Sequence, residues 1–133
     1  MFTGIIEAQG RVAALTPANG DVTLRIQSAE LDFGDVKLGD SIAVNGVCLT
    51  VTALDGGDAF SADVSGETLS LTSLGQLKNG SRVNLEKAMT PSTRMGGHLV
   101  SGHVDGLGTV KAMTSDARSV RIDIEAPAEL ARY

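Results

Sequence analysis

The clearest indication of the fold is the segment Ser41-Ile42-Ala43-Val44-Asn45-Gly46-Val47-Cys48-Leu49-Thr50-Val51. At its centre is the pair Asn45-Gly46, and both residue types tolerate the positive φ angles that a two-residue hairpin turn requires. The runs on either side, at 41–44 and 47–54, are short and rich in apolar and β-forming residues. They are therefore expected to pair as an antiparallel β-hairpin.

Similar runs lie before and after this hairpin. Runs at 10–15 and 22–26 flank a second Asn-Gly pair, and a run at 59–64 follows a Gly-Gly pair. A last run, at 82–89, alternates apolar with polar residues. Six short strands separated by glycine-rich turns predict an all-β fold.

The alternation stops between residues 65 and 74. Glu67 and Thr68 precede Leu69, Leu71 and Leu74 there, which predicts a short helix or helical turn. Six strands around one core, with a helical segment between the last two, fit a closed or nearly closed antiparallel Greek-key barrel. An open sheet would leave its edge strands unprotected.

A repeat with a spacing of 98 residues extends beyond this barrel. Identical residues recur at that spacing, namely Gly4, Gly10, Val12, Ala14, Thr16, Val22 and Ile26 on Gly102, Gly108, Val110, Ala112, Thr114, Val120 and Ile124. Average composition would produce about one or two such identities. We therefore expect a first barrel at 1–94 and the beginning of a second, similar barrel at 95–133. The second repeat is expected to be incomplete, because it contains only the first two strands.

The composition argues against several classes of protein. The 133 residues suffice for one well-packed domain, and 16 acidic against 11 basic residues give a net charge of -5. That charge repels nucleic acid and anionic lipid, so neither is expected as a partner. No apolar run reaches the roughly 20 residues that span a bilayer, and the first residues lack the features of a signal peptide. The chain is expected to be cytoplasmic.

The cysteine and the histidines give little sign of a disulfide or a metal site. Cys48 is the single cysteine, so an intrachain disulfide is excluded, which agrees with a reducing compartment. His98 and His103 match no metal-ligand pattern, and no metal site is expected. A histidine near a glycine is more often structural, although imidazole can carry protons near neutral pH, which makes His103 a candidate.

A group of polar residues on the hairpin is a candidate site. Cys48 and Thr50 share one face of their strand, and Ser41 lies on the neighbouring strand. A thiol and two hydroxyls on one surface can bind or polarise a heterocycle. From spacing alone, a small core cysteine and a β-forming threonine are the more common explanation. In the same way, the pair Glu67-Thr68 more often caps a helix than performs acid-base chemistry.

Four blocks of the sequence together resemble the riboflavin synthase family. The blocks are Met1-Phe2-Thr3-Gly4-Ile5-Ile6-Glu7, the stretch at 41–51, Glu67-Thr68-Leu69, and Gly96-Gly97-His98-Leu99-Val100-Ser101-Gly102-His103-Val104-Asp105-Gly106. They occur in the order found in the family, and the resemblance runs from residue 1 to residue 133. It implies two barrels of the riboflavin synthase type, followed in the family by a helix that joins three subunits.

The resemblance also implies an activity. Riboflavin synthases convert two molecules of 6,7-dimethyl-8-ribityllumazine into riboflavin and 5-amino-6-(D-ribitylamino)uracil, the last step of riboflavin biosynthesis, and need no metal or organic cofactor. Each barrel holds one lumazine, and the reacting pair forms where the first barrel of one subunit meets the second barrel of another. A homo-oligomer is therefore expected, a trimer in the full-length family and a dimer or larger assembly for this chain.

The site residues of the family carry over to particular positions of this sequence. Cys48, Ser41, Thr50 and His103 are implied as chemical participants. The implied binding residues are Cys48, Leu49, Thr50, Asp63, Val64, Ser65, Gly66, Glu67, Thr68, Gly102, His103 and Val104 for the first barrel, with Gly4, Ile5 and Ile6 for the site of the other barrel. Two alternatives stay open: a non-catalytic lumazine- or flavin-binding protein, and a structural barrel without a ligand.

Overall fold

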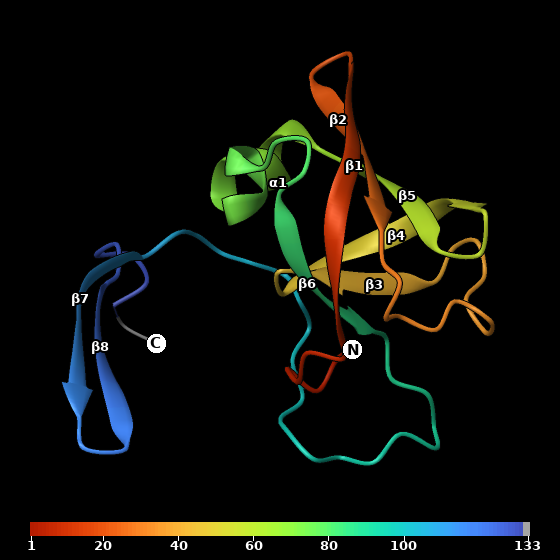
Figure 1. The fold of residues 1–133 in the computed structure, drawn as a ribbon. Coiled ribbons are helices and arrows are strands. Elements are labelled where there is room, and N and C mark those ends of the chain that lie inside the picture. Colours follow the sequence, from red (N-terminus) through yellow and green to blue (C-terminus); the bar gives the residue numbers. More distant parts are fainter. Residues whose placement is uncertain (132–133) are drawn as a thin grey trace.

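The computed structural model describes residues 1–131 and contains a closed barrel of six antiparallel strands (Figure 1). The barrel strands are β1 (Ala8–Ala18), β2 (Asp21–Gln27), β3 (Ser41–Val44), β4 (Val47–Asp55), β5 (Ala59–Val64) and β6 (Arg82–Lys87). They follow the order β1-β2-β5-β4-β3-β6 around the barrel, which then closes on β1. This order confirms the expected Greek-key barrel.

The hairpin around Asn45-Gly46 forms as expected. Asn45 has φ 49° and Gly46 has φ 80°, the left-handed conformation that this type of turn requires. The strands on either side pair in register, with Ser41 opposite Thr50.

Closure depends on strands that lie far apart in the sequence. β6 pairs with β1 on one side and with β3 on the other, and β2 pairs with β5. Every barrel strand therefore has two hydrogen-bonded neighbours, and no strand is left as an edge. The core inside is filled by apolar side chains that alternate with outward-facing ones, including Val12, Leu24, Ile26, Ile42, Val44, Leu49, Val51, Phe60, Val64, Val83 and Leu85.

The expected helical segment joins β5 to β6. It consists of a short helix α1 (Gly66–Leu71) and a 3₁₀-helix η1 (Ser73–Gln76). Leu74 of η1 is buried against the core and anchors the connection. The last barrel strand ends at Lys87, two residues earlier than the expected run at 82–89. The backbone N–H of Met89 donates instead to the carbonyl of Met1.

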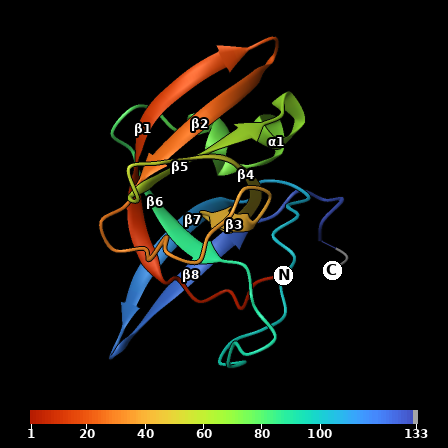
Figure 2. The same ribbon diagram turned by 90° about the vertical axis from the view of Figure 1, so that its right-hand side faces the viewer.

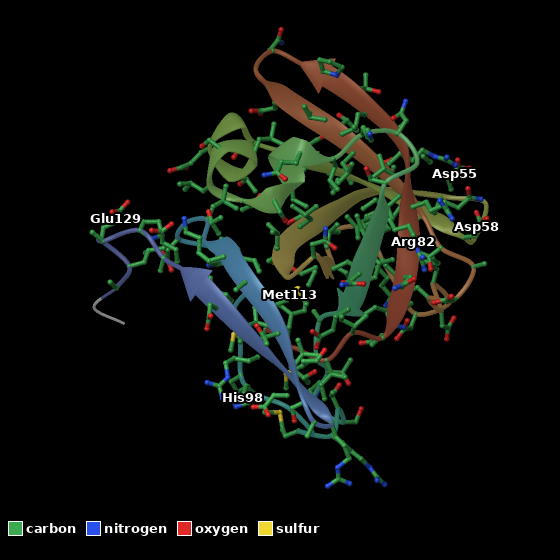
Figure 3. The ribbon with its side chains drawn as sticks, turned by 60° about the vertical axis from the view of Figure 1, so that its left-hand side comes forward. Asp55, Asp58, Arg82, His98, Met113 and Glu129 are labelled. Carbon is green, nitrogen blue, oxygen red and sulfur yellow. The ribbon has the colours of Figure 1, made fainter. Side chains whose placement is uncertain are left out.

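A second sheet lies apart from the barrel and consists of the hairpin β7 (Thr109–Asp116) and β8 (Ser119–Glu125) (Figure 1). Val110 pairs with Ile124 in this hairpin, just as Val12 pairs with Ile26 in β1 and β2, 98 positions earlier. All residues of β7 and β8 are exposed, and Met113 of β7 is labelled in Figure 3. Residues 132–133, the last two of the expected second unit, lie outside the described residues.

The N-terminal segment, residues 1–7, runs beside the chain that leads from the barrel to this hairpin (Figure 2). Phe2 and Val100 exchange both backbone hydrogen bonds, at 2.8 and 3.0 Å, and form an isolated antiparallel bridge. The contact holds part of the connection against the barrel. None of the helices within residues 1–131 is long and apolar enough to cross a membrane.

Candidate functional site

A cavity of about 380 Å³ opens between β4, α1 and the closing segment, which we define as residues 97–105. Its lining residues are Val47, Cys48, Glu67, Thr68, Leu71, Thr72, Gly102, His103, Val104 and Asp105. The volume falls in the range of small-molecule sites, roughly 300–1,000 Å³. Three parts of the chain that are distant in sequence therefore meet around one space.

The closing segment reaches the barrel through Gly102. The backbone N–H of Cys48 donates to the Gly102 carbonyl at 2.9 Å. Gly102 has φ +76°, and a Cβ atom there would lie 2.9 Å from both the Cβ and the N atom of Cys48. Glycine is thus required twice, by the left-handed conformation and by the close approach to β4. The contact places His103 and Val104 over the cavity.

The start of α1 is fixed by local hydrogen bonds. Ser65 is the N-cap, and its Oγ accepts the N–H of Thr68 at 3.1 Å. The N–H of Gly66 donates to Oδ1 of Asp21 at 3.2 Å. One turn later, the hydroxyl of the buried Thr72 donates to the carbonyl of Thr68 at 2.7 Å. These bonds hold Thr68 and its neighbour Glu67 at the wall of the cavity.

Cys48 and Thr50 face outward from β4. The residues that alternate with them, Val47, Leu49 and Val51, are buried in the barrel, whereas Cys48 is half-buried and Thr50 is exposed. Cys48 is therefore not a core residue, and its free thiol borders the cavity. Thr50 lies two residues further along the same face but does not line the cavity.

Ser41 lies elsewhere. It is opposite Thr50 in the β3–β4 ladder and lines a different cavity, of about 370 Å³, together with Glu7, Asp35 and Lys87. Burial raises the pKa of Glu7 above its usual value. The hydrogen bond from Lys87, 2.6 Å long, lowers the pKa of Asp35. The structure thus separates Ser41 from the cavity that contains Cys48 and His103.

Several other residues implied by the resemblance do not line the Cys48 cavity. Leu49 and Val64 are buried in the core, so only their backbone is near the outer face. Asp63 is exposed and accepts a hydrogen bond from the Thr23 hydroxyl at 2.7 Å. In the N-terminal segment, the exposed side chains of Ile5 and Ile6 do not line the Cys48 cavity.

Sequence reasoning missed several lining residues. Leu71 and Thr72 follow Glu67 and Thr68 by four positions, so they come onto the same face of α1. That spacing would have identified them once the helix was assumed. Asp105 has no local signal, because its place at the cavity depends on the whole closing segment.

The cavity offers groups suited to a polar heterocycle. The carboxylates of Glu67 and Asp105 can accept hydrogen bonds from ring N–H groups or from hydroxyls. The thiol of Cys48 and the imidazole of His103 can exchange protons. Across the described part of the chain, residues 1–131, no three His, Cys, Asp or Glu side chains gather as a metal site.

A closed antiparallel barrel with a polar cavity at its outer wall defines a class of small-molecule-binding β-barrel proteins. The model of one such family, described as the lumazine binding domain, matches residues 3–88. The chain belongs to this lumazine-binding domain family.

Individual relatives agree with this family. The chain is 48% identical over 133 residues to a riboflavin synthase of Photobacterium phosphoreum, with all of this chain and 61% of that protein covered. It is 47% identical over 136 residues to a riboflavin synthase of Mycobacterium tuberculosis, of which it covers 66%. The chain therefore spans less than two thirds of the length of these curated relatives.

Solved structures show the same fold. The crystal structure of LumP complexed with 6,7-dimethyl-8-(1'-D-ribityl) lumazine matches with a TM-score of 0.82 and 25% identity, over 99% of this chain and 70% of that chain. The structure of LumP complexed with riboflavin matches with a TM-score of 0.85 at the same identity, over 99% and 71%. The matches include nearly all of this chain, the β7–β8 hairpin as well as the barrel.

Proposed function

We propose that this chain binds the ring of a lumazine or a flavin in the cavity between β4, α1 and the closing segment. One observation carries the proposal: six of the residues implied by the resemblance line this one cavity, namely Cys48, Glu67, Thr68, Gly102, His103 and Val104. They come from three separate parts of the chain, so their meeting is a property of the fold. Structural neighbours solved with lumazine, riboflavin and flavin mononucleotide support the same ligand class.

We further propose that the whole protein is a riboflavin synthase, a transferase that moves a four-carbon unit between two molecules of 6,7-dimethyl-8-ribityllumazine. Identity of 47–48% to riboflavin synthases supports this activity more strongly than the 25% identity to LumP supports a binding role. The reaction needs two rings held face to face, so the main contribution of the protein is positioning.

The residues of this chain would divide the work in the following way. Cys48 and His103 approach the cavity from β4 and from the closing segment, and there they would pass protons to and from the ring. The ribityl chain would extend out of the cavity along the outer face of β4, where the hydroxyls of Thr50 and of Ser41, opposite it on β3, would bind the chain or a water molecule. Glu67 would accept hydrogen bonds from the ligand at the start of α1.

The second ring would bind in a second barrel that begins with residues 95–133. The shared register of β1–β2 and β7–β8 supports this division of the chain into a first unit at 1–94 and a second at 95–133. Gly4 and Gly102, 98 residues apart, have φ +79° and +76°. Gly4, Ile5 and Ile6 would therefore close the site of the other barrel as Gly102 closes this one. The reacting pair would form between subunits of a homo-oligomer.

A non-catalytic lumazine- or flavin-binding protein is the second candidate, because LumP has the same fold and its structures contain such ligands. The two candidates differ in turnover. A full two-barrel protein that binds lumazine but forms no riboflavin would establish the binding role and contradict the synthase proposal.

The binding proposal is tested by titrating the chain with riboflavin and following the quenching of flavin fluorescence. Saturable quenching is expected, and Gly102→Ala should weaken it about tenfold, because the added Cβ displaces the closing segment from Cys48. Gly80→Ala is the matched control: Gly80 has φ +84° and no atoms within 4 Å of an added Cβ. Absence of saturable quenching by the unsubstituted chain would indicate a barrel without this ligand.

A further inference from the structure

Glu86 of β6 is a buried acidic residue outside the cavity. Only 7% of its surface is exposed, although charged side chains are seldom buried without partners. Its Oε1 accepts the backbone N–H and the hydroxyl of Thr3, both at 2.6 Å, and its Oε2 accepts the N–H of Gly4 at 3.1 Å. Charge-assisted hydrogen bonds of this kind are the stronger class. The carboxylate thus holds the N-terminal segment against the barrel.

The N-terminal segment in turn holds the closing segment. The Thr3 carbonyl accepts the N–H of His98 at 2.8 Å, and Phe2, the residue before Thr3, pairs with Val100, two residues after His98. Figure 3 labels His98 on this part of the chain. A Cβ on Gly97 would overlap the Thr3 carbonyl oxygen, which shows how closely the two segments pack. Any displacement of Thr3 is therefore passed to the closing segment.

The closing segment then continues into the cavity wall. Two residues beyond Val100, the Gly102 carbonyl accepts the N–H of Cys48, and the buried ring of Phe2 lies 3.2 Å from the position of a Cβ on Gly102. Glu86, Thr3 and the closing segment form a continuous chain of contacts that ends beside His103. The position of the cavity wall depends on a carboxylate that does not line the cavity.

Strand pairing does not explain why a carboxylate occupies this position. β6 is already hydrogen-bonded to β1 and to β3 through its backbone, whatever side chain residue 86 carries. Burying a charge costs desolvation free energy, which an apolar side chain would avoid, but an apolar side chain would leave the donors of Thr3 and Gly4 unpaired. What a carboxylate provides, and an amide or an apolar group does not, is two acceptor oxygens that serve Thr3 and Gly4 at once.

We propose that Glu86 is a positioning residue for the ligand site: through Thr3 it sets the place of the closing segment, and so of His103 and Val104, over the bound ring. The inference rests on the proposed function of the cavity. Glu86 itself does not touch the ligand. Without it the closing segment would populate open arrangements, and the apparent affinity falls in proportion to the fraction that stays closed.

The test is the affinity of the full chain for riboflavin, measured by fluorescence quenching. Glu86→Gln keeps one acceptor oxygen but turns an NH₂ group toward the N–H of Gly4, so we expect binding about tenfold weaker. Glu30→Gln is the matched control, because Glu30 also accepts a backbone N–H, that of Gln9 at 3.0 Å, and loses the same charge. Its affinity should equal that of the unsubstituted chain.

A second pair of variants covers the case in which Glu86→Gln does not fold. Thr3→Val removes the hydroxyl that donates to Glu86, whereas Thr3→Ser keeps it. We expect Thr3→Val to weaken riboflavin binding and Thr3→Ser to bind riboflavin as tightly as the unsubstituted chain. Equal affinity of the two variants would contradict the inference.

Amide hydrogen exchange separates positioning from general stabilisation. In Glu86→Gln, the amides of His98 and Cys48, which bond Thr3 and Gly102, should exchange faster, while those of the β2–β5 ladder keep their rates. Uniformly faster exchange would show that Glu86 only stabilises the barrel, and unchanged riboflavin affinity would also overturn the inference. If the unsubstituted chain binds no riboflavin, the proposed function itself fails, and the inference with it.

Discussion

The hairpins β1–β2 and β7–β8 share a strand register but differ in their surroundings. Val12 pairs with Ile26, and Val110 pairs with Ile124, each next to a register shift at the same point of the strand. Yet Val12 and Ile26 are 2% and 0% exposed, whereas Val110 and Ile124 are 55% and 64% exposed. Register is therefore encoded within about 20 residues, while burial depends on the strands that pack against the hairpin.

The largest difference should appear in self-association. The apolar face of β7–β8, formed by Val110, Met113, Val120, Ile122 and Ile124, is exposed. We expect a polypeptide of these 133 residues to form a dimer or larger assembly at micromolar concentration, which corresponds to about 8 kcal/mol of association free energy. Sedimentation velocity measures it.

A matched variant locates the interface of that assembly. Substituting Val120, Ile122 and Ile124 together by threonine keeps the β-propensity but removes the apolar surface. The assembly should then dissociate into monomers. A monodisperse monomer before any substitution would refute the prediction, and an assembly that survives the substitutions would place the interface on the barrel.

Shortening an isoleucine side chain to alanine should lower the free energy of unfolding much more in β1–β2 than in β7–β8. Ile26→Ala leaves a cavity inside the closed barrel and should lower the free energy of unfolding by about 2–5 kcal/mol. Ile124→Ala, its counterpart, should change it by less than about 0.5 kcal/mol, because the side chain is exposed. Urea unfolding at submicromolar concentration, where the chain is dissociated, measures both. Equal costs would mean that β7–β8 packs against the barrel in solution.

Glycine substitution should give a smaller contrast of the same sign. A Cβ on Gly10 would lie 2.9 Å from Cδ1 of the buried Leu85, whereas on Gly108 it would lie 3.0 Å from Cγ2 of the exposed Ile124. Gly10→Ala should therefore cost about 1–3 kcal/mol, since the core cannot move aside. In Gly108→Ala the side chain of Ile124 can rotate away, so the melting temperature should change little. A comparable loss in both would show that the backbone, not the core, opposes the substitution.

The smallest effect is expected from the ion pairs. Lys87 lowers the pKa of Asp35, so the charged form of Asp35 stabilises the barrel above its ordinary pKa of 3.8, and that stability is lost as the pH falls through the lowered value. Asp35→Asn should therefore lose less stability on acidification, an effect reduced by salt. Glu125→Gln removes the exposed ion pair with Lys111 in the β7–β8 hairpin and should leave the unfolding of the barrel unchanged. Unfolding curves measured across acidic pH would detect both, and identical pH profiles for Asp35→Asn and the unsubstituted chain would contradict the first expectation.

Much of the fold could be predicted because its signals are local. The turn at Asn45-Gly46, the strands around it and the helix after Val64 depend on neighbouring residues and formed as expected. The period of a strand also placed Cys48 and Thr50 on one face, but that this face points away from the core was seen only in the structure. These features need only the chemistry of a few successive residues.

The site could be predicted only in part. Cys48, Glu67 and His103 were identified by resemblance, and the structure places them around one cavity. Asp105 was missed, and Ser41 lines a different cavity, because the path of the closing segment and the separation of the outer surfaces arise from packing. No sequence pattern shows which strand face will be covered by a distant segment.

The strand pattern, the turns, the 98-residue repeat and its register can be read from the amino-acid sequence, since each depends on backbone preferences and side-chain alternation over short distances. The burial of Glu86 by Thr3, 83 positions away, could not be read from it, because Glu86 is one charged residue on an alternating strand. The physical reason is that burial and hydrogen bonding of a charged group are properties of contacts between distant segments. Such contacts exist only after the barrel has closed.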